Sequence, residues 1–129
     1  MNIRYTFVLA MIAGFGLGAV VIDRLHAQAK PPVYVVIDIG EITDPEGFKA
    51  VGARPNSAGA EVFKAQGGRY VARTQNITAL DGTPPKRMII IAFDSVEKAQ
   101  AWNSSAPQKE VNAIRMKTTK SRSFIVEGM

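Results

Sequence analysis

The chain contains no cysteine, and its one histidine is His26. Without cysteine it has no disulfides, no thiolate metal ligands and no thiol nucleophile. If His26 is removed with an N-terminal signal segment, the remaining chain lacks imidazole as well. A Ser-His-Asp triad, a histidine-bound zinc and a histidine-bound haem are then excluded. We therefore expect neither a metal nor a cofactor.

Long runs of one charge are absent too, since the longest basic run is the pair Lys86-Arg87. Residues 30–129 carry 14 basic and 10 acidic side chains, which are scattered along the chain. Scattered charge favours solubility over nucleic-acid binding. The most basic stretch holds Arg115, Lys117, Lys120 and Arg122. We interpret it as a solvated helix face, the alternative being a surface for an anionic ligand or a membrane.

The first 29 residues predict a signal peptide. Arg4 lies in a short positive segment, residues 7–22 form an apolar run of 16 residues, and Ala27-Gln28-Ala29 fits the pattern that signal peptidase reads. We expect cleavage after Ala29 and a periplasmic or secreted protein. The run is shorter than the roughly 20 residues of a spanning helix. The alternatives are a membrane anchor through residues 7–22 or a buried N-terminal helix.

Residues 30–129 then form a single domain. Apolar and β-branched segments predict strands at residues 33–41, 69–74, 87–93 and 123–127. Helical spacing predicts one helical region between the first two strands and another between the last two. The order β-α-β-β-α-β predicts an α+β, ferredoxin-like fold, with a four-stranded antiparallel sheet and helices on one face.

Local signals mark the ends of these elements. Asp44 and Pro45 suit the cap and first position of a helix, and Ser95 suits the cap of another. Pro55 is expected to kink or split the first helical region. Gly67-Gly68 is expected to end it in left-handed geometry. Asp81-Gly82 predicts a turn inside a loop over residues 75–86.

The third strand and the first are apolar on both faces. Helices on one side of the sheet leave the other side bare, and Tyr34 and Val36 make this bare side hydrophobic. A large uncovered apolar face is rare on a monomer. We therefore expect a homodimer that packs sheet against sheet, as a dimeric α/β barrel.

An ordered series of residues resembles the domain of unknown function 1330 family over about Pro32 to Gly128. The series comprises Tyr34, Ile42-Thr43-Asp44-Pro45-Glu46, Gly67-Gly68, Leu80-Asp81-Gly82, Pro85, Arg87, Phe93-Asp94-Ser95, Ala99, Trp102, Arg115 and Val126-Glu127-Gly128. The resemblance implies membership of the dimeric α/β-barrel superfamily, which includes cofactor-independent monooxygenases and isomerase-like enzymes. Where the resemblance leads us to expect tyrosines, the chain has Val51, Asn103 and Pro107, which implies a less aromatic cleft.

Asp38 is the first candidate for catalysis, because it interrupts an apolar strand face and a desolvated carboxylate can serve as a general base. The alternative is an ion pair with an arginine such as Arg69 or Arg87. Tyr34 and Asp81 are weaker catalytic candidates, since the first offers a phenol and the second lies at a position shared with the family.

Four further residues are candidates for ligand binding. Asp44 is either a cleft residue or a helix cap. Arg69 and Arg87, which we expect to flank the loop, either bind an anion or form surface ion pairs. Trp102 either walls an aromatic pocket or packs in the core.

Three functions remain open at this point. The first is an exported homodimer that binds a small organic ligand in the cleft between sheet and helices. The second is a cofactor-independent enzyme, monooxygenase- or isomerase-like, that uses Asp/Arg/Tyr acid–base chemistry. The third is a structural interaction partner in the cell envelope.

Overall fold

The computed structural model describes residues 30–53 and 57–129. The signal-peptide prediction for residues 1–29 and the predicted kink at Pro55 therefore lie outside the described residues. The elements of the described part are β1 (Val33–Ile42), α2 (Pro45–Ala53), α3 (Ser57–Ala65), β2 (Arg69–Thr74), β3 (Arg87–Phe93), α4 (Val96–Asn103), α5 (Ala106–Thr118) and β4 (Thr119–Glu127).

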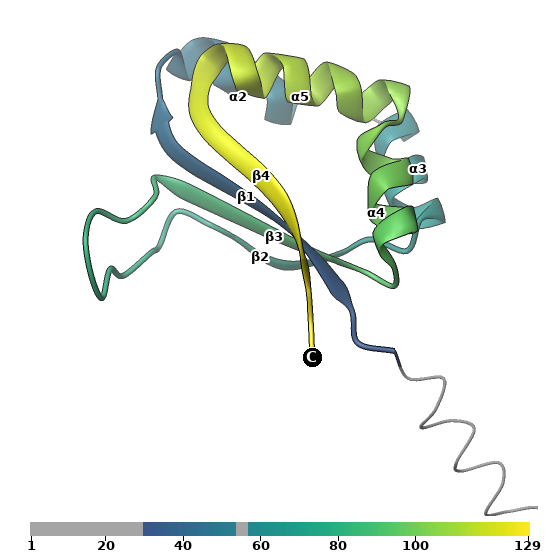
Figure 1. Ribbon diagram of the computed structural model, residues 1–129. Helices are drawn as coiled ribbons and strands as arrows, with labels where there is room; N and C mark the ends of the chain where they lie inside the picture. The colour runs from purple at the N-terminus through teal and green to yellow at the C-terminus, as the bar shows by residue number, and fades with distance from the viewer. Residues whose placement is uncertain (1–29, 54–56) are drawn as a thin grey trace, which may run out of the picture. The chain divides into compact units, whose positions relative to one another are not determined.

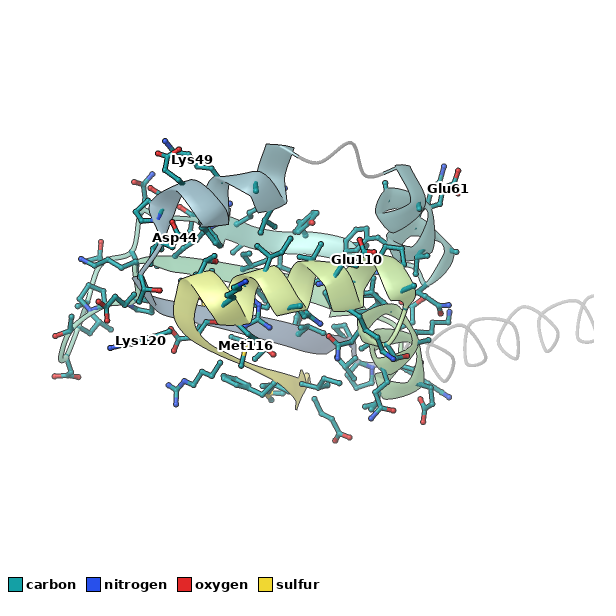
Figure 2. All side chains as sticks on the ribbon, turned by 90° about the horizontal axis from the view of Figure 1, so that it is seen from above. Asp44, Lys49, Glu61, Glu110, Met116 and Lys120 are labelled. Carbon is teal, nitrogen blue, oxygen red and sulfur yellow. The ribbon has the colours of Figure 1, made fainter. Side chains whose placement is uncertain are left out.

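The four strands form one antiparallel sheet in the order β2-β3-β1-β4. The helices all lie on one side of this sheet (Figure 1). Seen from above, α5 crosses over the sheet beside α2 (Figure 2). This order and layering confirm the predicted α+β, ferredoxin-like fold.

Alternation along β1 divides its side chains between the two faces of the sheet. Val33, Val35, Ile37 and Ile39 are buried, whereas Tyr34, Val36 and Asp38 are only half-buried. Side chains in a strand point alternately to opposite faces, so the buried set faces the helices. The register places Val35 opposite Ile91 of β3 and Ile125 of β4 on the helix side.

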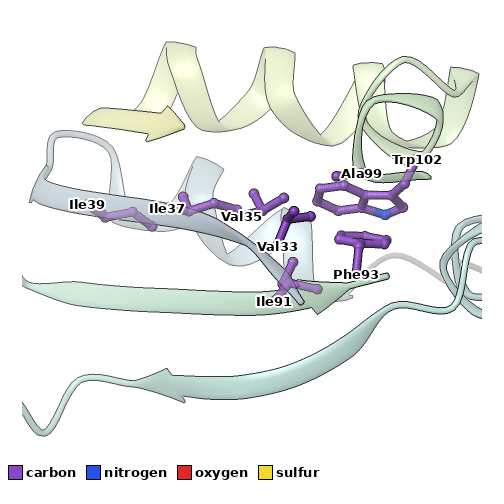
Figure 3. Close-up of a cluster of buried hydrophobic side chains, with 8 residues drawn as sticks. All are labelled: Val33, Val35, Ile37, Ile39, Ile91, Phe93, Ala99 and Trp102. Atoms are coloured by element: carbon purple, nitrogen blue, oxygen red, sulfur yellow. The ribbon is translucent and has the colours of Figure 1, made fainter. Parts of the chain in front are cut away.

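The core lies between the centre of the sheet and the helices. The largest fully buried side chains are Phe93, Ile39 and Ile91. Trp102 of α4 packs on Phe93 with ring centroids 5.4 Å apart, and Ala99 lies one turn earlier on the same helix (Figure 3). Fully burying a side chain of this size contributes roughly 1.5–3 kcal/mol to folding, so this cluster anchors α4 on the sheet.

The predicted helix signals are confirmed. Asp44 Oδ1 accepts a hydrogen bond from the Gly47 amide at 3.1 Å, and Ser95 Oγ accepts one from the Lys98 amide at 3.2 Å. Gly67 has φ +73°, and the Gly68 amide bonds to the carbonyl of Phe63, five residues back. This is the left-handed helix end that only glycine adopts without strain.

The C-terminal strand differs from its predicted bounds. We expected a strand at residues 123–127, but β4 begins at Thr119, directly after α5 ends at Thr118. The added residues are polar, so their sequence shows no apolar alternation. They become strand because they pair with the end of β1, where Ser121 lies opposite Ile39 and Thr119 opposite Ile42.

The side of the sheet without helices carries apolar side chains, and we call it the open face. It comprises Tyr34, Val36 and Asp38 of β1, Met88, Ile90 and Ala92 of β3, and Arg122, Phe124 and Val126 of β4. Phe124 and Val126 are 43% and 44% exposed. The bare apolar face expected from the sequence is therefore present in the described part of the chain.

Candidate functional site: a cleft between sheet and helices

A cleft of ≈ 340 Å³ lies where α4 meets the helix side of β1 and β4. We call it the helix–sheet cleft. It is lined by Val35 of β1, by Ala99, Gln100 and Asn103 of α4, and by Ser123, Phe124 and Ile125 of β4. Walls that combine apolar side chains with a few polar groups are typical of sites for small organic molecules, which have volumes from about 300 Å³ upward.

The polar groups of the cleft come from α4 and β4. Asn103 Oδ1 accepts a hydrogen bond from Asn112 Nδ2 of α5 at 2.9 Å, and Asn112 Oδ1 in turn accepts one from Gln108 Nε2 at 3.0 Å. This chain fixes the carboxamide of Asn103. Within residues 30–53 and 57–129, no hydrogen bond engages the side chain of Gln100 or Ser123. Both side chains are therefore available to form hydrogen bonds with a ligand.

A second, larger hollow of ≈ 590 Å³ lies at the other end of β1 and β4. It is lined by Asp38, Gly40, Thr83, Pro84, Pro85, Lys120, Ser121 and Arg122. Its charged groups are already paired. Arg122 Nε donates to Asp38 Oδ2 at 3.1 Å, and Lys120 Nζ lies 3.2 Å from Glu41 Oε2. We favour the smaller cleft as the ligand site because the side chains of Gln100 and Ser123 are unengaged there, whereas the charged groups of the larger hollow are already paired.

The predicted catalytic residues do not converge. Tyr34 and Asp38 lie on the open face of β1, and Asp81 is exposed in the loop between β2 and β3. Asp38 does form an ion pair, but the partner that we expected was wrong. It is Arg122 of β4, which lies directly opposite Asp38, and not Arg69 or Arg87.

The predicted ligand-binding residues are also dispersed. Asp44 caps α2, and Trp102 is 5% exposed and packs in the core. Arg69 Nη1 lies 3.3 Å from Asp94 Oδ1 in an exposed ion pair. The expectation that Arg69 and Arg87 flank the loop was wrong. In an antiparallel pair the first residues of the two strands lie at opposite ends, so only Arg87 adjoins the loop.

The prediction that Arg115 is exposed to solvent was wrong. Arg115 was assigned to a solvated helix face, yet it is 7% exposed and its guanidinium reaches Ser121 Oγ at 2.7 Å. Lys117 is exposed on α5, as expected, whereas Lys120 and Arg122 are exposed but lie on the strand β4 and not on a helix. The lining residues Ala99, Gln100 and Ser123 were not singled out either. No local signal marked Ser121 and Ser123 as one face of a strand, because both are polar and alternate with the charged Lys120 and Arg122.

Asn103 links the cleft to the family resemblance. It stands where the resemblance leads us to expect a tyrosine, and it lines the helix–sheet cleft. Val51 and Pro107, the other two such positions, are half-buried in α2 and at the start of α5. The cleft of this chain therefore has a carboxamide at a position where an aromatic ring was expected.

The described ranges contain neither a metal-binding cluster nor a membrane-spanning helix. Residues 30–53 and 57–129 contain no cluster of three or more Asp, Glu, His or Cys side chains placed to hold a metal ion. In the same residues, no helix has the length and apolar character needed to cross a membrane.

Comparison with known proteins places the chain by family and by fold. The family model described as "Domain of unknown function (DUF1330)" matches residues 32–129. No match was found among curated proteins. The helix–sheet cleft, β4 and Arg115 all lie within the matched residues.

Two solved structures illustrate the fold likeness. A protein of unknown function from Rhodopseudomonas palustris is similar at 18% identity and a TM-score of 0.59, over 84% of this chain and 92% of that one. SnoaB, a cofactor-independent oxygenase from Streptomyces nogalater, is similar at 15% identity and a TM-score of 0.51, over 77% of this chain and 94% of that one. At these identities the likeness concerns the fold alone.

Proposed function

Since the chain belongs to the domain of unknown function 1330 family, which has no assigned reaction, we propose a function from its geometry: it is an exported homodimer that binds a small organic molecule in the helix–sheet cleft. The observation that carries the proposal is the cleft itself. Its apolar walls, Val35, Ala99 and Ile125, adjoin the unengaged polar side chains of Gln100 and Ser123.

The chemistry of the lining favours binding over catalysis. Gln100, Asn103 and Ser123 supply amides and a hydroxyl, which orient a ligand but do not exchange protons readily near neutral pH. Acid–base catalysis in the cleft would need a titratable group there, and Asp38 and Tyr34 lie on the opposite face of the sheet. The fold likeness to a cofactor-independent oxygenase keeps an enzymatic role as the alternative.

The homodimer part of the proposal is supported by the open face. Phe124 and Val126 are each more than two-fifths exposed, and they lie opposite the half-buried Val36 and Tyr34 of β1. A second copy that brings the same face is self-complementary, and packing would remove this apolar area from water. Light scattering during size-exclusion chromatography of residues 30–129 is expected to give twice the subunit mass.

Export is proposed from the sequence of residues 1–29. The full-length protein expressed in a Gram-negative host is expected in the periplasmic fraction, with Lys30 as its first residue by mass spectrometry. Recovery of the uncleaved chain in the membrane fraction would support the anchor through residues 7–22 instead.

Ligand binding is tested by a thermal-shift screen of residues 30–129 with one- and two-ring aromatic compounds, both neutral and acidic. A ligand that binds only the folded state raises the melting temperature. Ser123→Leu places a larger side chain in the cleft and is expected to abolish the shift. Thr78→Leu, in the exposed loop, is the matched control and should keep it. Equal shifts in both variants would place binding elsewhere, and no shift with any compound would reject the proposal.

A further inference from the structure

Arg115 is a buried cation whose hydrogen bonding is incomplete. It is 7% exposed, and Nη1 donates to Ser121 Oγ at 2.7 Å and approaches Met116 Sδ at 3.9 Å. Nε is buried without any partner. A guanidinium has five N–H donors, and leaving one of them buried without an acceptor is unfavourable. In the described part of the chain no carboxylate forms a salt bridge with Arg115.

The position of Arg115 in the last turn of α5 explains only part of this arrangement. A positive charge there interacts favourably with the helix dipole. Dipole stabilisation does not require burial, however, and Lys117 provides the same charge from an exposed position. The interaction with the helix dipole also provides no hydrogen-bond acceptor for Nε of Arg115. Burial lowers the pKa of Arg115 from its ordinary value because it removes solvent from the cation, yet an arginine stays protonated in proteins.

The Arg115–Ser121 contact adjoins the helix–sheet cleft along β4. Ser121, Ser123 and Ile125 alternate on the helix side of that strand, since their partners in β1 are the buried Ile39, Ile37 and Val35. Ser123 and Ile125 line the cleft. Same-face neighbours in a strand are roughly 7 Å apart, so Ser121, which itself lines the larger hollow, lies roughly 7 Å along β4 from the cleft residue Ser123.

A second connection runs through α5. Asn112, one turn before Arg115, donates to the cleft residue Asn103. Residues three apart on a helix lie on neighbouring parts of its surface. Arg115 does not line the cleft itself, but its surroundings connect to the cleft along β4, where Ser121 neighbours Ser123, and along α5, through Asn112.

From these contacts, and on the basis of the binding function proposed above, we infer that Arg115 anchors the carboxylate of an organic acid whose apolar body fills the helix–sheet cleft. The planar guanidinium matches a carboxylate with two parallel hydrogen bonds. A ligand carboxylate that displaces the packing around Nε would supply the acceptor that Nε lacks, while Nη1 keeps its hydrogen bond to Ser121 Oγ.

The first test compares 2-naphthoate with 2-naphthamide, which have the same ring system and differ in charge. Isothermal titration of the unmodified residues 30–129 is expected to show 2-naphthoate binding on the order of ten- to a hundredfold more tightly, which is the usual weight of a hydrogen-bonded charged group. Equal affinity for the two compounds would overturn the role of Arg115 and leave the binding function intact. If neither binds and the wider screen also fails, the binding function itself is rejected.

The second test follows Arg115 directly. Arg115→Met keeps a long apolar side chain and removes the charge, so it should reduce 2-naphthoate affinity to that of 2-naphthamide. Lys117→Met removes an exposed cation two residues away and should leave both affinities unchanged. Loss of affinity in both variants would show a non-specific charge effect and overturn the inference.

A third measurement needs no apolar variant and so does not depend on Arg115→Met folding. The Nε–H signal of Arg115 in a ¹H–¹⁵N spectrum, assigned by its absence in Arg115→Lys, should move when 2-naphthoate is added and stay in place with 2-naphthamide. A signal that 2-naphthoate does not move would contradict contact between Arg115 and the acid.

Discussion

Asp38 and Arg122 lie directly opposite each other on β1 and β4, and Arg122 Nε donates to Asp38 Oδ2 at 3.1 Å. The two side chains differ in environment, since Asp38 is 18% exposed and Arg122 is 77% exposed. An ion pair with one solvated partner is screened by water. The pair borders the larger hollow and belongs to the open face, so its strength reports on how much solvent reaches that face.

We predict that this ion pair contributes little to stability. A double-mutant cycle with Asp38→Asn and Arg122→Gln, measured by urea unfolding at one protein concentration, should give a coupling energy of about 0.2–1 kcal/mol. High salt should reduce it further. A coupling of several kcal/mol would mean that the pair is shielded from water in the assembled protein.

Charges placed on the open face should separate the proposed dimer. In the variant with Phe124→Glu and Val126→Glu, two carboxylates would have to be buried if the sheets still packed together, which is strongly unfavourable. Light scattering is expected to give a single subunit mass, with an unchanged far-UV circular dichroism spectrum. Met116→Glu, on a side chain of α5 that is 63% exposed, is the control and should retain the mass of the unmodified protein.

Asp44 should behave as a helix cap. Asp44→Ala removes the acceptor of the Gly47 amide and should destabilise the protein by about 1 kcal/mol. Asp44→Asn retains an acceptor and should cost only a few tenths of that. Binding of 2-naphthoate should be the same in both variants at temperatures where they are folded. Weaker binding by Asp44→Asn, at unchanged stability, would assign Asp44 to the ligand site.

Truncating Trp102 should lower the free energy of unfolding more than truncating any other residue of α4. Its ring packs against Phe93 and Phe63, with centroids 5.4 and 6.2 Å away, so Trp102→Ala should cost about 3–5 kcal/mol. It is the only tryptophan in the chain, and unfolding of the variant must therefore be followed by circular dichroism. Leu80→Ala, at a side chain that is 95% exposed, is the control and should change stability by less than about 0.5 kcal/mol.

Much of the fold was accessible from the sequence because local chemistry and global packing agree. The alternation in β1, the caps Asp44 and Ser95 and the glycine pair at residues 67–68 each specify one element. Their order then leaves the ferredoxin-like arrangement as the simplest way to bury the apolar faces. The fold assignment followed from features that span only a few residues each.

The candidate site was less accessible because it depends on pairing between distant residues. Ser121 and Ser123 are polar, and nothing local shows that they face the helices until their register with Ile39 and Ile37 is known. Arg115 appears as one of several exposed cations until the strand begins at Thr119 and brings Ser121 beside it. The partner of Asp38 was missed for the same reason, since Arg122 lay outside the predicted strand.

Strand β4 begins at Thr119, directly after α5 ends at Thr118. The chain should therefore tolerate insertions and deletions less well at this junction than in the loop between β2 and β3. Inserting or deleting one residue there would shift β4 by one position, so that Ser121, Ser123 and Ile125 would exchange faces with Lys120, Arg122 and Phe124. The same change in the loop over residues 75–86 would alter no strand register. Related chains can therefore differ in length between β2 and β3, whereas at the start of β4 we expect them to differ by substitutions and not by insertions or deletions.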